Sequence, residues 1–230
     1  MGKMSRATIF ITGTSTGVGK TVLTTLLTAY WRQTGVPVAA LKPVCSGGRE
    51  DAEWLARAMG GELALDEMNP WHFRAAVAPL LAARSEGRRV VLAEILAHAR
   101  AMRRRFAVVL IEGAGGLLSP LGERVDSRDL IVDLRAVPVI VAPNELGVVN
   151  QVRLTLAALP LTVRRLAVVV LMDPVRTDAS TRTNADLLGE YLDRGRIWLF
   201  PRVPQPLDLP GALKNRRVRE TLAGIIAHCQ

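Results

Sequence analysis

The chain has 230 residues, of which 49% are hydrophobic, and a formal net charge of +9. It is long enough to bury a large core, and its two cysteines, Cys45 and Cys229, lie far apart in sequence. These features exclude a small disulfide-stapled extracellular fold and indicate a reducing cytoplasm. No run of about 18 apolar residues occurs, so we expect neither a membrane span nor a membrane partner.

The excess positive charge does not predict a nucleic-acid partner. It comes from 26 arginines against 4 lysines, and the arginines are scattered along the chain. The run from Arg103 to Arg105 falls at the end of an expected helix, where cations interact favourably with the helix dipole. No aromatic residues alternate with the basic runs as stacking platforms for bases would. We therefore expect no binding of nucleic acid.

Expected strands and helices alternate along the chain. The strands are expected at residues 8–12, 38–42, 107–111, 137–142, 166–172 and 197–200, and the helices at residues 20–33, 52–59, 92–104, 128–134, 148–159 and 184–193. Segments such as VVLI and VVVLM are apolar on both faces, which favours a parallel sheet covered by helices. We predict one α/β domain over residues 1–230, with a doubly wound, mostly parallel sheet and helices on both faces. Residues 1–3, before Met4, are expected to be an artificial addition and are left out of this prediction.

A glycine-rich stretch, GTSTGVGKT, runs from Gly13 to Thr21 between the first expected strand and the first expected helix. This order is the context of a phosphate-binding loop. The glycines let successive N–H groups face one anion, and the helix adds free N–H groups and the positive end of its dipole. Lys20 would reach the β- and γ-phosphates, and Thr21 would bind Mg²⁺. Five residues separate Gly13 from Gly19 where the usual pattern has four, so a Gly-rich turn without function stays open as an alternative.

Acidic residues beyond the carboxyl ends of the strands are candidate metal ligands, because ligands of doubly wound sheets bind there. Glu112 ends an apolar strand and begins EGAGG, where it would meet Mg²⁺ directly or through water. The alternative is a strand-ending acid before a flexible turn. Asp51 opens an expected helix, and its spacing leaves open whether it binds Mg²⁺ or only stabilises the helix start. Glu50 competes with it for the role.

Three further positions are candidates for substrate contacts. Lys42 ends the second expected strand and should face the same crevice as the loop, although a lysine there is commonly a solvated edge residue. Ser46, in the sequence SGG beside it, could help to wrap an anion or an amine. Asn150 lies in ELGVVNQ, which opens a helix whose free N–H groups could hold a carboxylate, although an ordinary helix start is the simpler interpretation. We interpret Cys45 as a small filler, because no histidine falls in these loops to activate it.

Taken together, GTSTGVGKT, KPVCSGG, the helix-opening Asp51, VVLIEGAGGLLSPL and ELGVVNQ resemble the dethiobiotin synthetases over roughly residues 7–205. The resemblance implies a P-loop NTPase-like fold, a cytoplasmic homodimer and a ligase of biotin biosynthesis that uses Mg²⁺ and ATP. In that family, 7,8-diaminopelargonate and CO₂ form a carbamate. The carbamate attacks the γ-phosphate to give a carbamic-phosphoric anhydride, and the second amine closes the ring to dethiobiotin with release of ADP and phosphate.

The resemblance also implies roles for individual residues. Lys20, Lys42 and Thr16 match catalytic residues, and Thr21, Asp51 and Glu112 match the metal ligands. Ser46 matches a residue that holds the diamine or its carbamate, while Gly147 and Asn150 match a segment that holds the substrate carboxylate from the partner subunit of a homodimer. The implied nucleotide-binding residues are Gly13, Thr14, Gly17, Val18, Gly19, Lys20, Thr21, Met172, Pro201 and Val203, the last two in a Pro-rich loop beside the expected base.

The chain departs from the family pattern at two positions. Some members carry a Glu in the loop where this chain has Gly17. Some carry an Asn that reads adenine just after the fifth strand, where the nearest position here is Met172. We hypothesise from Met172 that the nucleotide preference is relaxed or altered, so that another nucleoside triphosphate could replace ATP.

Three other functions stay open. A related ATP-dependent amide-forming ligase would share the fold. An ATPase of the partitioning type would usually carry an additional lysine early in the phosphate loop, which is absent here. A non-catalytic binding module is disfavoured by the presence of Lys20, Thr21 and Glu112 together.

Overall fold

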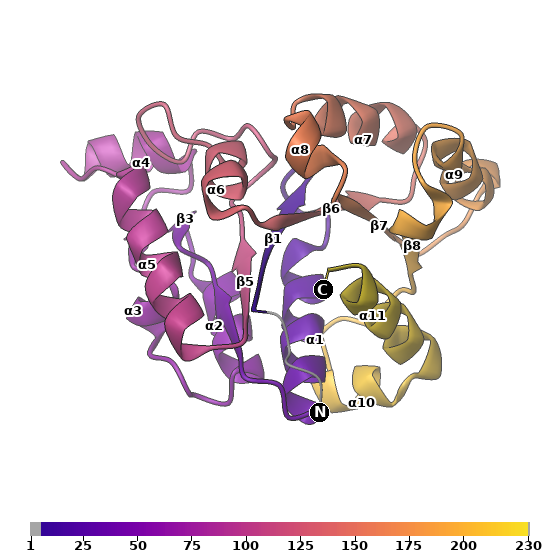
Figure 1. The fold of residues 1–230 in the computed structure, drawn as a ribbon, viewed down its shortest axis with the longest axis horizontal. Helices are drawn as coiled ribbons and strands as arrows, with labels where there is room; N and C mark the ends of the chain where they lie inside the picture. The colour runs from indigo at the N-terminus through magenta and orange to yellow at the C-terminus, as the bar shows by residue number, and fades with distance from the viewer. Residues whose placement is uncertain (1–5, 230) are drawn as a thin grey trace.

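The computed structural model describes residues 6–229, so residues 1–3, interpreted above as an addition, lie outside it. A six-stranded parallel sheet occupies the centre, in the order β2-β5-β1-β6-β7-β8 (Figure 1). Its strands are β1 (Ala7–Gly13), β2 (Val38–Leu41), β5 (Val108–Glu112), β6 (Val137–Pro143), β7 (Val168–Met172) and β8 (Ile197–Phe200). All six correspond to strands expected from the sequence, within a few residues at the ends.

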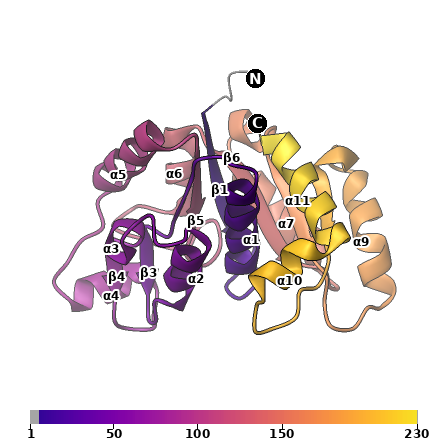
Figure 2. The same ribbon diagram turned by 90° about the horizontal axis from the view of Figure 1, so that it is seen from below.

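Helices cover both faces of this sheet, which confirms the doubly wound fold (Figures 1 and 2). The helices α1 (Lys20–Gln33), α2 (Glu50–Ala58), α10 (Leu209–Lys214) and α11 (Arg216–Cys229) pack together on one face. The other face carries α5 (Leu92–Arg105), α6 (Ser127–Leu134), α7 (Val148–Ala157), α8 (Leu161–Arg164) and α9 (Ala179–Gly189). Because the sheet is covered twice, every residue of β5 is buried, as its VVLI run predicted.

The strand order brings three motifs to one edge of the sheet. β1 is central, and its Ile9 lies opposite Leu110 of β5 and Val137 of β6. Since neighbouring strands are parallel, the carboxyl ends of β2, β5 and β1 meet at the same edge. The phosphate-loop motif follows β1, Lys42 follows β2, and Glu112 ends β5. The connections from neighbouring strands lead to opposite sides of the sheet here, from β1 to β2 and from β5 to β6, and doubly wound proteins bind their ligands at such a point.

A smaller substructure was not expected from the sequence. β3 (Val44–Ser46) and β4 (Trp71–Phe73) form a separate parallel pair beside α3 (Leu65–Met68) and α4 (Pro79–Ser85) (Figure 2). Strands of three residues are too short to show an alternating pattern, and one turn of helix shows no 3.6-residue period. A 3₁₀ turn, Arg194–Arg196, was missed for the same reason.

Two helix predictions were incomplete. The helix expected at residues 184–193 is α9, which begins five residues earlier because Asp178 caps it: the Asp178 carboxylate accepts a hydrogen bond from the Thr181 N–H at 2.9 Å. The helix α11 is missing from the helices predicted above, although its buried Val218, Leu222 and Ile225 follow helical spacing. Within residues 6–229, no helix has both the length and the apolar composition that a bilayer span requires.

Candidate active site

The phosphate-loop motif forms the turn from β1 into α1. Gly17 and Gly19 have φ angles of 75° and 98°, in the left-handed region that favours glycine. Gly19 is the N-cap of α1, and no side chain caps this helix. The helix therefore begins with N–H groups and a positive dipole end directed at the loop, which is the arrangement that binds phosphate.

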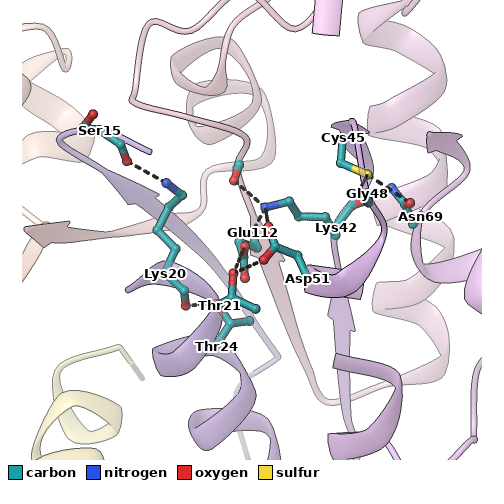
Figure 3. Close-up of polar contacts among 11 residues, drawn as sticks. Ser15, Lys20, Thr21, Thr24, Lys42, Cys45, Gly48, Asp51, Asn69 and Glu112 are labelled. Carbon is teal, nitrogen blue, oxygen red and sulfur yellow. Dashed lines mark hydrogen bonds and ion pairs between the residues drawn. The ribbon is translucent and has the colours of Figure 1, made fainter. Parts of the chain in front are cut away.

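Lys20 is folded back over this loop. Only 6% of the residue is exposed, and its Nζ donates a hydrogen bond to the Ser15 carbonyl oxygen at 2.8 Å (Figure 3). Burial, together with the positive charge of Lys42, lowers the pKa of Lys20 to about 8. The ammonium is thus poorly compensated by its protein neighbours, and a phosphate group in the loop would supply the missing negative charge.

Four predicted residues meet beside the loop, although they come from four different segments (Figure 3). The Thr21 Oγ1 of α1 lies 2.8 Å from Oδ1 of Asp51 on α2 and 2.8 Å from Oε1 of Glu112 on β5. The Lys42 Nζ lies 2.8 Å from Asp51 Oδ2 and 2.6 Å from Glu112 Oε1. Asp51, and not its neighbour Glu50, makes these contacts, because the second residue of α2 faces the cluster while Glu50 is exposed.

Lys42 attracts the carboxyl groups of Asp51 and Glu112 in this cluster. Burial alone would lower the pKa of Lys42, but the carboxylates of Glu112 and Asp51 outweigh burial and raise it, so Lys42 is an ammonium. Burial would likewise raise the pKa of Asp51, whereas Lys42 and the Thr21 hydroxyl lower it. The Lys42 ammonium is therefore held between the carboxyl groups of Asp51 and Glu112.

The same cluster has the oxygen donors that suit Mg²⁺. Glu112 Oε2 is buried without a hydrogen-bond partner. The Thr21 hydroxyl has one hydrogen, so it can donate to only one of the two carboxylate oxygens that lie 2.8 Å away. Within residues 6–229 there is no group of three or more His, Cys, Asp or Glu side chains placed to hold a metal. Two carboxylates and a hydroxyl fit Mg²⁺, which usually takes its other ligands from water and phosphates.

A cleft of about 460 Å³ opens next to the cluster. Its wall includes Thr16, Lys42, Cys45, Ser46, Gly48, Asp51, the segment 76–79, Ala114, Gly115, Ser119 and Pro120. The Ser46 hydroxyl donates to the Val77 carbonyl oxygen, which ties β3 to the opposite wall. A hollow of about 510 Å³ over α6 and α7 is slightly larger, but none of the predicted site residues line it.

Cys45 behaves as the filler that the sequence indicated. It is buried, its Sγ lies 3.2 Å from the Asn69 Oδ1, and burial raises the pKa of its thiol. Sequence reasoning did not identify Asn69, because a single asparagine before a proline gives no signal of its own.

Several predicted residues lie away from the cleft. Gly147 caps α7 with a φ of 94°, and Asn150 is exposed on the first turn of α7; neither lines the cleft within one chain. The Met172 side chain, at the end of β7, packs against Gly19 of the phosphate loop. Pro201 is buried and Val203 is half-buried just after β8.

The fold and the loop define the class of protein as an α/β nucleotide-binding protein of the P-loop NTPase type. A family model described as an AAA domain matches residues 7–205. The solved MinC:MinD cell division protein complex of Aquifex aeolicus aligns with a TM-score of 0.62 over 96% of both chains. Sequence identity there is 15%, so this likeness shows the fold alone.

Sequence relatives narrow the class to one family. The chain is 39% identical to the ATP-dependent dethiobiotin synthetase BioD of Anaeromyxobacter dehalogenans strain 2CP-C, over 85% of this chain and 90% of the relative. It is 36% identical to the enzyme of the same name from Caulobacter sp. strain K31, over 84% of this chain and 87% of that one. The chain therefore belongs to the ATP-dependent dethiobiotin synthetase family, which confirms the resemblance seen in the motifs.

Proposed function

We propose that the chain converts 7,8-diaminopelargonate and CO₂ to dethiobiotin, with Mg²⁺ and ATP, in biotin biosynthesis. One observation supports this above others: the cluster of Thr21, Lys42, Asp51 and Glu112 joins the phosphate loop to the cleft. A single site can then bring a γ-phosphate and a second substrate together. The name of the relatives, ATP-dependent dethiobiotin synthetase, agrees with this chemistry.

Each group of site residues has its own role in the proposed reaction. Thr16 and Lys20 hold the phosphates, and Thr21, Asp51 and Glu112 would hold Mg²⁺. When bound, Mg²⁺ would neutralise phosphate charge and fix the orientation of the γ-phosphate. Lys42 points from the end of β2 into the cleft that Ser46 also lines, so these two residues would hold the diamine or its carbamate.

The reaction needs positioning and charge stabilisation more than a protein nucleophile. One amine adds to CO₂ and loses a proton to give a carbamate. A carbamate oxygen then attacks the γ-phosphorus, and ADP leaves. The second amine attacks the carbonyl carbon of the resulting anhydride, phosphate leaves, and the urea ring is closed. Holding that amine beside the carbonyl carbon is worth roughly 7–11 kcal/mol of barrier, and Lys20 and Lys42 would stabilise the anionic oxygens.

In this proposal, a second subunit binds the substrate carboxylate. Gly147 and Asn150 do not line the cleft of their own chain. The α7 region exposes Leu146 and Leu154 at 83% and 63%, and Leu154 lines one hollow together with Leu118, which is 53% exposed. An apolar surface of this kind suits burial against a second copy of the chain. The proposed enzyme is therefore a homodimer in which the start of α7 reaches the partner's cleft.

The test is ADP release by the purified protein with Mg²⁺, ATP and bicarbonate, in the presence and absence of 7,8-diaminopelargonate, with mass detection of the product. Diamine-dependent turnover that yields the cyclic urea is the expected result. ATP hydrolysis that ignores the diamine would instead favour a partitioning-type ATPase. Turnover with another amine or acid would favour an amide-forming ligase, and no hydrolysis at all would favour a binding module.

The nucleotide preference is a separate prediction. Met172 offers a thioether where an amide would recognise adenine, and its side chain rests on Gly19. We expect kcat/KM with CTP or GTP to approach the value with ATP, because no side-chain amide at this position selects the base. Substituting Met172→Asn should restore a preference for ATP. A steep ATP preference in the unmodified enzyme would contradict the prediction.

A further inference from the structure

Asn69 is a buried polar residue outside every motif described above. It follows α3 directly and is 1% exposed. Its Nδ2 donates a hydrogen bond to the Lys42 carbonyl oxygen at 2.6 Å. Its Oδ1 accepts from the Arg49 Nε at 3.2 Å and lies 3.2 Å from the Cys45 Sγ (Figure 3). One side chain thus contacts three points of the segment 42–49.

Hydrogen bonds to backbone carbonyl oxygens add to the Asn69 side-chain contacts at both ends of the segment. The Lys42 N–H donates to the Met68 carbonyl oxygen at 3.0 Å, immediately before Asn69. At the other end, Arg49 Nη2 donates to the Asn69 carbonyl oxygen at 3.1 Å, and Arg49 Nη1 pairs with Asp66 at 2.8 Å. Arg49 is the N-cap of α2, so its position sets where α2 and its acids begin.

These contacts link Lys42, which is proposed to hold the diamine, with Asp51, which is a proposed Mg²⁺ ligand. Lys42 stands at one end of the segment, and Asp51 lies two residues beyond the other end. Between them, the Lys42 Nζ and the Asp51 Oδ2 are 2.8 Å apart. The remaining parts of the site, Lys20 and Thr21 on α1 and Glu112 on β5, belong to elements that Asn69 does not touch through its side chain.

We propose that Asn69 is a positioning residue, which fixes the Lys42 ammonium relative to the Asp51 carboxylate by clamping both ends of segment 42–49. The proposal rests on the function proposed above. An amide suits the task because it provides a donor for the Lys42 carbonyl oxygen and an acceptor for Arg49 at once. A shift of about 1 Å in a reacting group can cost on the order of 10²-fold in rate. Loss of the Asn69 contacts that hold segment 42–49 would therefore lower the rate.

Two substitutions test the two ends of segment 42–49 separately. Asn69→Asp keeps an acceptor for Arg49 and nearly the same shape, but it removes the donor to the Lys42 carbonyl oxygen. Arg49→Met releases the α2 end. Each is expected to lower kcat/KM for the diamine on the order of 10- to 100-fold, with unchanged affinity for an ATP analogue measured without diamine and without Mg²⁺, because Asp51 is a proposed Mg²⁺ ligand. The double variant should be little worse than the poorer single variant, because both act through one clamp.

A second measurement does not depend on turnover. Cys45 is buried against Asn69, so a loosened clamp should make the native Cys45 thiol react faster with a maleimide. Leu188→Ala, which opens a cavity under α9 at the β8 edge of the sheet, opposite β2, is the matched control for lost stability: its melting temperature should fall while diamine kcat/KM and the Cys45 labelling rate stay as in the unmodified enzyme.

The outcomes separate this inference from the proposed function. An unmodified enzyme without diamine-dependent turnover contradicts the function, and the labelling rates then still test the clamp. An active enzyme whose Asn69→Asp and Arg49→Met variants keep diamine kcat/KM and slow labelling overturns the clamp. So does an equal loss of affinity for the ATP analogue, since Asn69 would then act on the whole fold.

Discussion

Replacing Lys20 by methionine is expected to lower kcat for ADP formation on the order of 10²- to 10³-fold. The Lys20 ammonium is buried over the phosphate loop and has a backbone carbonyl oxygen as its hydrogen-bond partner. It is therefore available to stabilise the negative charge that grows on the phosphates in the transition state. Methionine keeps a similar length and volume but carries no charge, so the change removes the electrostatic contribution with little loss of packing.

The stability of the Lys20→Met variant distinguishes a catalytic from a structural role. Burial and repulsion by Lys42 disfavour the Lys20 ammonium in the folded protein, as the lowered pKa of about 8 reflects. We therefore expect the unfolding midpoint of the nucleotide-free variant to stay level or rise. Initial rates of ADP release and urea denaturation of the same preparation measure the two effects.

Lys214→Ala is the matched control for this prediction. Lys214 is an exposed lysine at the end of α10, outside the cleft and the phosphate loop. Its replacement should leave kcat unchanged. If Lys20→Met retained near-normal kcat, or lost activity only in proportion to unfolded protein, Lys20 would have no role in the chemical step.

The positions of the phosphate-loop motif and of Glu112 in the fold could be predicted from the sequence because their signals are local. Gly17 and Gly19 supply the positive φ angles that the turn requires, and a β-branched strand precedes them. Glu112 ends an unbroken apolar strand, so its place at the carboxyl edge of the sheet followed from the fold class alone. For these residues, the local sequence pattern was enough to predict the position in the fold.

The rest of the site depends on contacts that no local pattern encodes. Whether Asp51 or Glu50 faces the cluster is decided by the first turn of α2. Its N-cap, Arg49, is held there by hydrogen bonds to Asn69, which lies 20 residues further along the chain. That Lys42 pairs with Glu112 follows from β2 lying beside β5, a neighbour 70 residues away in sequence. The short strand β3 supplies Cys45 and Ser46 to the wall of the cleft and pairs with β4, and both strands have too few residues to show a period.

Glu112→Gln is expected to have an effect on activity as large as that of Lys20→Met. The substitution preserves shape but removes the charge from a fully buried carboxylate that contacts both Thr21 and Lys42. We expect kcat to fall on the order of 10²-fold or more and Mn²⁺, used as a probe for Mg²⁺, to bind at least about tenfold more weakly. Initial rates and metal titration by calorimetry measure these quantities. The control is Glu123→Gln, because Glu123 pairs with Arg84 on the surface, where loss of the ion pair should change neither quantity.

Stability separates the two roles of Glu112, as metal ligand and as partner of Lys42. Removing one member of a buried ion pair commonly costs roughly 3–5 kcal/mol, but Asp51 still faces Lys42 here, so we expect roughly 1–3 kcal/mol for a lost charged hydrogen bond. Adding Lys42→Met to Glu112→Gln also removes the buried ammonium, which Asp51 alone compensates only in part, so the free energy of unfolding should recover while activity and Mn²⁺ binding stay lost. Recovery of Mn²⁺ binding in the double variant would show that Glu112 serves only to hold Lys42. Failure of the free energy of unfolding to recover would show that the loss in the single variant comes from packing and not from charge.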